Sequence, residues 1–177
     1  NRAEVWVFDI AGPSITKPVV EPHRLVILDH PIFCKPFNRY LVEISNALFI
    51  VTRSFGEKEK TNPDAPNGIG CYYTAKFKVY QLDVSKSTLN EVITLGESSV
   101  FLGRSGSMSI DSSRFTGVKP NRIYFIDDMM DQYRFCEGGG GGRDMGAYNL
   151  EDGSFESFYP GLSLSPICRP TWITPSF

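Results

Sequence analysis

Three carboxylates at the end of one predicted strand are the first residues whose type and spacing could support chemistry. Asp127, Asp128 and Asp131 follow the apolar segment at residues 123–126. Two carboxylates that face each other can share a proton and act in general acid–base catalysis. Neighbouring strand residues point to opposite faces, so Asp127 and Asp128 share no proton unless the chain bends between them. We therefore expect a solvated loop here rather than a catalytic pair.

Two other patterns that could support catalysis are incomplete. The glycine run at residues 138–142 has the composition of a phosphate-binding loop, but Arg143 and Asp144 follow it instead of the Lys-Ser/Thr pair that such a loop needs. The segment GRSGS at residues 103–107 differs from the Gly-x-Ser-x-Gly elbow of serine hydrolases, and no histidine follows it to act as a base. We predict no catalytic residue and no cofactor.

The histidines and cysteines are too scattered for a metal site. The histidines are His23 and His30, and the four cysteines stand far apart, at positions 34, 71, 136 and 168. Zinc sites need ligands at short spacings such as Cys-x-x-Cys, a motif that this sequence lacks. We expect no bound metal. We expect free thiols in a reducing compartment, with disulfides as the alternative.

The segment at residues 129–135, MMDQYRF, has the composition of a contact surface. Methionine, tyrosine and arginine are enriched where proteins bind one another. The equally weighted alternative is that the apolar side chains of this segment pack onto their own sheet. The predicted protein-binding residues are Met130, Tyr133, Arg134 and Phe135.

Short apolar runs separated by Gly, Pro, Asn and Asp must position this segment. Residues 40–44 and 48–53 flank Ser45-Asn46, a pattern that predicts a β-hairpin with a two-residue turn. In residues 75–83, apolar and polar side chains alternate, as in a half-buried strand. Further strands are predicted at 5–8, 25–28, 90–95, 99–103, 106–110, 121–127, 145–150 and 154–158, with one helical turn at 111–115.

These strands fall into two units of similar order, at about 40–95 and 100–158. Residues 79–83 and 147–151 share the order aromatic, polar, Leu, acid. A repeated four-stranded unit of about 40–50 residues is typical of a β-propeller blade. The fold class predicted is therefore all-β, a kelch-like β-propeller whose blades have four antiparallel strands, forming a partial ring. The alternative is a β-sandwich with coincidental spacing.

The predicted boundaries divide the chain into four parts. Residues 1–39 form the end of a preceding blade and a linker, residues 40–98 and 99–160 each form a blade, and residues 161–177 form an extended closing segment. In that last segment we expect Trp172 to close the ring or cap a core rather than to anchor a partner. Propellers typically have four to eight blades, so we expect 177 residues to be the C-terminal part of a larger protein.

The composition excludes several classes of partner. Hydrophobic residues make up 41% and charged residues 21% of the chain, which is typical of a folded domain. The net charge of −2 gives no reason to expect nucleic acid or an anionic membrane as partner. The apolar runs are also far too short to span a bilayer. We expect neither a nucleic acid nor a membrane partner.

A series of short segments occurs in a characteristic order. They are YLVE at 40–43, LFIVTR at 48–53, FKVYQLD at 77–83, LGE at 95–97, VFLG at 100–103, GVKPNRIYF at 117–125 and MGAYNLEDG at 145–153. In this order they resemble the plant F-box-associated β-propeller family, long called domain of unknown function 295. The segment TWITPSF at 171–177 also resembles the C-terminal end of that family. The resemblance covers most of the chain from Tyr40 onward.

This resemblance implies a function in protein recognition. Members usually carry an N-terminal F-box that docks a Skp1-like adaptor, and their propeller presents a protein substrate for ubiquitin transfer. No F-box is present in these residues, so it either lies upstream or is lacking. We expect the substrate receptor of an SCF-type (Skp1–cullin–F-box) E3 ubiquitin ligase, non-enzymatic, in the nucleus, the cytoplasm or both. The alternatives are a propeller scaffold without an F-box, in an organelle, and a propeller hydrolase or sugar-binding enzyme.

Overall fold

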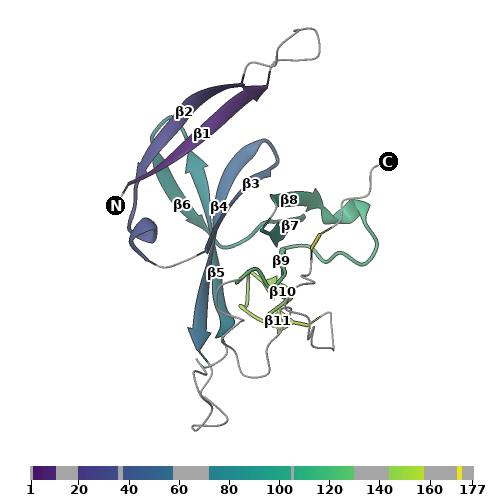
Figure 1. Ribbon diagram of the computed structural model, residues 1–177. Coiled ribbons are helices and arrows are strands. Elements are labelled where there is room, and N and C mark those ends of the chain that lie inside the picture. The colour runs from purple at the N-terminus through teal and green to yellow at the C-terminus, as the bar shows by residue number, and fades with distance from the viewer. Residues whose placement is uncertain are drawn as a thin grey trace.

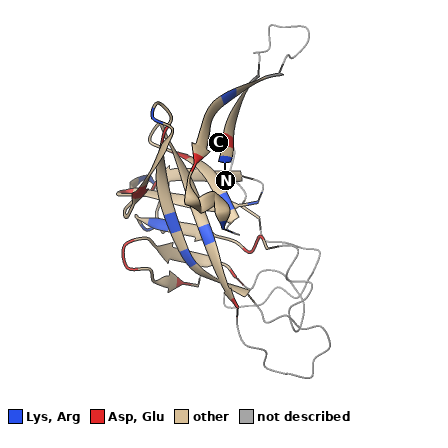
Figure 2. Cartoon of the chain, turned by 90° about the vertical axis from the view of Figure 1, so that its left-hand side faces the viewer, with Lys and Arg blue, Asp and Glu red and all other residues tan. Residues whose placement is uncertain are grey.

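The computed structural model describes residues 2–10, 20–35, 38–57, 72–104, 106–129, 144–157 and 171–172. In this part of the chain the regular elements are strands and two short 3-10 helices, arranged in three sheets (Figure 1). None of the helices described is long and apolar enough to cross a membrane. Lys and Arg are mixed with Asp and Glu over the sheets in the view of Figure 2, as the near-neutral composition predicts.

The first large sheet is a four-stranded antiparallel meander. It has the order β3 (Asn38–Ile44), β4 (Ala47–Glu57), β5 (Tyr72–Asp83) and β6 (Thr88–Val92). Ser45 and Asn46 join β3 to β4 with φ of 50° and 63°, the left-handed conformation that a tight two-residue hairpin turn requires. Alternate residues of β3 are buried, namely Tyr40, Val42 and Ile44, as in a strand with one face on the core. This sheet has the strand number and order of a propeller blade.

The second large sheet departs from that pattern. It contains β7 (Ser98–Gly103), β8 (Gly106–Asp111), β9 (Arg122–Phe125), β10 (Gly146–Asn149) and β11 (Phe155–Glu156), in the order β11-β10-β9-β7-β8. Four antiparallel strands were predicted, but this sheet has five, and β7 pairs with β9 in parallel. After β7 the chain turns back and forms β8 along one side of β7. It then passes through the 3-10 helix η2 (Ser112–Arg114) to the other side of β7, where β9 pairs.

A separate hairpin precedes both large sheets. Strand β1 (Arg2–Ile10) pairs with β2 (Val20–Asp29), and the 3-10 helix η1 (Pro31–Cys34) leads toward β3. One face of the hairpin packs on the first large sheet through Val26, Leu28 and Ile50. Trp6 and Phe8 in β1 remain 44% and 59% exposed. Figure 1 shows the far end of the hairpin extending away from the other sheets.

The main core lies between the two large sheets. It joins Val42 and Val79 of the first sheet to Val100, Ile123 and other buried residues of the second. Strand β3, at the edge of the first sheet, lies beside β8, at the edge of the second, and the Ser109 hydroxyl donates a hydrogen bond to the backbone oxygen of Glu43. The contact between these two edge strands fixes how the sheets meet.

The all-β propeller prediction is confirmed, and most predicted strands are present within one or two residues. The largest difference is at β2, which begins at Val20 rather than at position 25. The strand predicted at 90–95 is β6 at Thr88–Val92. Pairing between β5 and β6 begins with Asp83 and Thr88 and ends with Val79 and Val92. Beyond β6, Leu95 donates its backbone N–H to the Asn121 side-chain oxygen, so the chain has already turned toward the second sheet.

Candidate functional site

The predicted protein-binding residues Met130, Tyr133, Arg134 and Phe135 lie outside the described residues, as does the glycine run at 138–142. Their role stays a prediction. The described residues on either side of this segment in the sequence are Met129 and Asp144. Both lie at a cluster of buried polar groups, which defines the candidate site.

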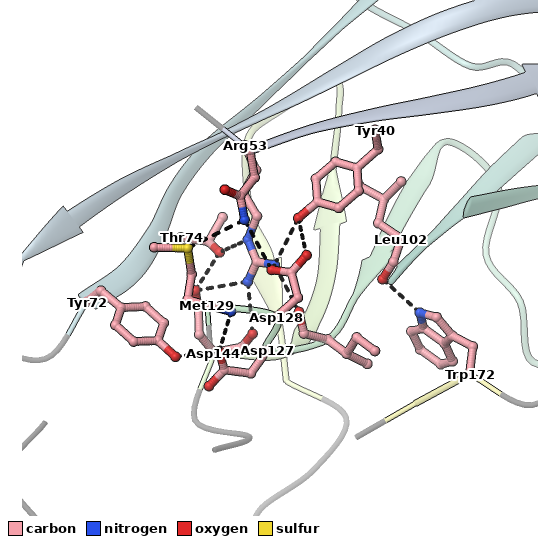
Figure 3. Close-up of polar contacts among 12 residues, drawn as sticks. Tyr40, Arg53, Tyr72, Thr74, Leu102, Asp127, Asp128, Met129, Asp144 and Trp172 are labelled. Atoms are coloured by element: carbon pink, nitrogen blue, oxygen red, sulfur yellow. Dashed lines mark hydrogen bonds and ion pairs between the residues drawn. The ribbon is translucent and has the colours of Figure 1, made fainter. Parts of the chain in front are cut away.

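Arg53 of β4 lies at the centre of this cluster and is completely buried (Figure 3). Its Nε donates to the Thr74 hydroxyl at 2.8 Å. Its Nη1 donates to the Ile126 carbonyl at 2.9 Å and to Asp128 Oδ1 at 2.8 Å. Its Nη2 donates to the backbone oxygen and to Oδ2 of Asp144, both at 3.0 Å. One side chain of the first sheet thus binds the chain after β9 and the chain before β10.

Three aromatic rings surround the same guanidinium. Its central carbon lies 5.1 Å from the ring centre of Phe55, 5.8 Å from that of Phe77 and 4.7 Å from that of Phe125. The ring faces attract the cation and also exclude water from it. A desolvated charge is tolerated only where opposite charges and hydrogen bonds compensate it, and Asp128 and Asp144 supply both.

Two tyrosines complete the cluster. The Tyr40 hydroxyl of β3 donates to Asp128 Oδ2 at 2.6 Å, and the Tyr72 hydroxyl of β5 donates to Asp127 Oδ1. Burial, reinforced by Asp128 and partly offset by Arg53, raises the pKa of Tyr40 above its usual value. Burial opposes the charge of Arg53, but Tyr40, Asp144 and Asp128 outweigh it and raise the pKa of the guanidinium. The neutral phenol and the charged arginine therefore persist together.

The expectation of a solvated loop around Asp127 and Asp128 was wrong. Asp127 is 3% exposed and the side chain of Asp128 is 7% exposed, because the chain folds back over the end of the first sheet. The two carboxylates do point to different partners, as their adjacent positions predicted, and they form no shared acid–base pair. Asp131 lies outside the described residues.

Sequence reasoning missed Arg53, although a signal was present. Arg53 is two residues from Val51 in the apolar strand LFIVTR, so both side chains point to the same face. Val51 is fully buried, and an arginine on a buried face needs carboxylate partners. The pattern could have predicted a buried ion pair, but it could not have identified Asp128 and Asp144 as the partners.

A polar hollow of about 370 Å³ opens beside this cluster. It lies where β3 begins and where β7 turns into β8, and Tyr40 and Asp128 connect it to the buried arginine. Its lining residues are Asn38, Arg39, Tyr40, Gly103, Arg104 and Asp128. No group of three His, Cys, Asp or Glu side chains placed to hold a metal ion occurs in the described ranges.

Trp172, near the C-terminus, packs against the second large sheet. Its indole N–H donates to the Leu102 carbonyl at 2.8 Å (Figure 3). Its ring meets Phe101 edge-on at 5.0 Å. Phe101 in turn stacks on Tyr124 of β9 at 4.7 Å. Trp172 thus covers the face of β7 that carries Phe101, and its role in closing the ring stays a prediction.

The four-stranded antiparallel meander has the topology of a β-propeller blade, and comparison with known proteins identifies the family. Residues 1–149 match the KIB1-4 beta-propeller family, and the chain belongs to it. This result confirms the resemblance to the plant F-box-associated propellers.

Two curated relatives from Arabidopsis thaliana are similar to the chain. "Putative F-box protein At1g65770" is 29% identical over 126 residues, covering 71% of this chain and 35% of the relative. "Probable F-box protein At1g65740" is 27% identical over 129 residues, covering 73% and 34%. The chain therefore spans about a third of the length of the curated relatives it matches. No solved structure matches it.

Proposed function

We propose that this propeller is the substrate-receptor part of an F-box protein in an SCF-type (Skp1–cullin–F-box) E3 ubiquitin ligase. The observation that carries the proposal is the match of more than two thirds of the chain to two proteins named as F-box proteins. An F-box in the full-length protein binds the Skp1-like adaptor, and the propeller binds the protein to be ubiquitinated. The propeller itself acts by recognition and catalyses no reaction.

The arrangement of the buried cluster supports a recognition role. Arg53 binds Asp128 and Asp144, which lie on the two sides of residues 130–143 in the sequence. A rigid anchor at both ends is what a binding segment on a propeller needs, because preorganisation lowers the entropic cost of association. The predicted contacts Tyr133, Arg134 and Phe135 belong to the segment between these two anchors.

The experiment is affinity purification of the tagged full-length protein from plant cells. We expect a Skp1-like adaptor and a cullin to co-purify with it. The matched variant carries Tyr133→Ala, Arg134→Ala and Phe135→Ala. It should retain the adaptor and lose ubiquitin-conjugated proteins, because the two partners bind different parts of the molecule.

The location of the full-length protein gives an independent readout. A fluorescent fusion is expected in the nucleus, the cytoplasm or both, where the ligase operates. If no adaptor co-purifies and the fusion enters an organelle, the ligase assignment is overturned in favour of a propeller scaffold without an F-box.

A further inference from the structure

The polar hollow at the start of β3 has the features of a binding site for a negatively charged group. It is bordered by two segments that are distant in sequence, Asn38–Tyr40 of β3 and the turn Gly103–Arg104 after β7. Both lie near the contact between β3 and β8, the edge strands at which the two large sheets meet. A site at this junction is held by two sheets, so its geometry is rigid.

Arg39 is fixed before any ligand binds. Its Nη2 donates to the backbone oxygens of Ile32 at 2.9 Å and Lys35 at 2.6 Å, and its guanidinium lies over the Phe33 ring at 5.5 Å. Within the described residues, no acceptor binds its Nε or Nη1. These N–H groups are available, and an arginine that is already ordered loses little side-chain entropy when it binds a carboxylate.

Arg104 supplies the second positive charge from the turn between β7 and β8. Its side chain is exposed, and no described residue forms a hydrogen bond or ion pair with it. Both arginines line the hollow, and no carboxylate among the described residues forms an ion pair with either of them. An anion that binds both guanidinium groups gains charge-assisted hydrogen bonds.

The floor of the hollow restricts which anion fits. Asp128 accepts from Arg53 and Asn38 at Oδ1 and from Tyr40 at Oδ2, so its carboxylate is already satisfied. Its negative charge still faces the hollow and opposes a doubly charged ligand more than a singly charged one. A carboxylate is therefore favoured over a phosphate group.

We propose that this hollow binds an Asp or Glu side chain of an acidic segment in the protein that the propeller recognises, with Arg39 and Arg104 as the contacts. This inference rests on the proposed function, because it gives the chemistry of the segment recognised. It assigns to the junction between β3 and β8 a specificity for acidic peptides.

The test uses the full-length protein and a fluorescein-labelled hexaglutamate peptide, with binding measured by fluorescence anisotropy. We expect binding that weakens as salt rises, and no binding of a hexaglutamine peptide. Arg104→Glu should weaken binding about tenfold, since it replaces an attractive contact with a repulsive one. Arg39→Lys, which keeps the charge but removes the planar fork, should weaken binding about threefold.

The matched control is Arg114→Glu, a charge reversal at another exposed arginine, in η2. It should leave the affinity for hexaglutamate unchanged. Equal weakening by Arg104→Glu and Arg114→Glu would show attraction by overall charge alone and would overturn the proposal. So would stronger competition by inorganic phosphate or a phosphoserine peptide than by glutamate, which would identify a phosphate site instead.

The two proposals fail separately. Loss of the Skp1-like adaptor from the purified protein contradicts the ligase function but leaves the anisotropy result intact. Absence of hexaglutamate binding in a protein that still co-purifies with the adaptor contradicts only the assignment of this hollow.

Discussion

Arg53 and Asp128 form a buried ion pair, with 2.8 Å between Nη1 and Oδ1, that connects β4 to the segment after β9. The two side chains are 1% and 7% exposed. Asp144 pairs with the same guanidinium from the other side of residues 130–143. This junction adds to the apolar core and the β3–β8 contact that hold the two large sheets together.

Replacing Arg53 with Met should lower the free energy of unfolding by about 3 kcal/mol, because Asp128 and Asp144 would remain buried without their partner. Chemical denaturation of the full-length protein measures this loss. Arg24→Ala, which breaks the exposed pair with Glu4 at 3.4 Å, is the control and should cost less than about 0.5 kcal/mol. Similar losses for the two variants would contradict a structural role for the buried pair.

Tyr40→Phe should lower the free energy of unfolding by about 1 kcal/mol, because it removes the hydrogen bond to Asp128 and keeps the ring. The pKa of Tyr40 is raised on folding from its ordinary value of 10.0. Its contribution to stability is therefore complete below pH 10 and is lost as pH rises further, since only the unfolded chain ionises there. Between pH 8 and 11, the free energy of unfolding should decline less steeply in the Phe variant than in the unchanged protein. Parallel curves of free energy against pH for the two proteins would refute this coupling.

Asp83, the last residue of β5, should titrate far below an ordinary carboxyl. Hydrogen bonds from the Ser85 hydroxyl at 2.6 Å and the Lys86 N–H at 3.0 Å, with the nearby Lys86 ammonium, lower its pKa from 3.8 to about 2. Its stabilising effect is present above pH 3.8 and is lost as pH falls toward 2.

An NMR titration of the Asp83 carboxyl checks this value. Ser85→Ala should raise the pKa toward 3.8 and leave Asp111, which is bound by Ser113, unchanged. A pKa of Asp83 that does not respond to Ser85→Ala would show that the hydroxyl is not the main cause.

Gly146→Ala should destabilise the second large sheet. A Cβ atom at this position would lie 2.6 Å from the Glu156 carbonyl oxygen of the neighbouring strand, closer than real contacts allow. The backbone must shift, at a cost of about 2 kcal/mol. Gly106→Ala is the matched control, because nothing lies within 4 Å of its added methyl group. Equal thermal unfolding temperatures for the two variants would show that β11 shifts to make room for the methyl group without loss of stability.

Local interactions made several elements predictable. The hairpin from β3 to β4 follows from two short apolar runs around Ser45 and Asn46, two residues suited to a tight turn. The 3-10 helix η2 was expected from its cap, and the Asp111 side chain does accept the Ser113 N–H. Each of these signals acts between residues only a few positions apart.

The sequence alone thus determined the all-β class and most strands, since periodicity and turn chemistry act locally, and the order of its motifs carried the resemblance to the F-box-associated propellers. Only the tertiary structure decided the parallel pairing of β7 with β9 and the burial of Asp127 and Asp128. It also decided the partners of Arg53, which lie 75 and 91 residues away along the chain. Such contacts depend on how the two sheets pack together. A local sequence pattern does not determine which distant segments come into contact on folding.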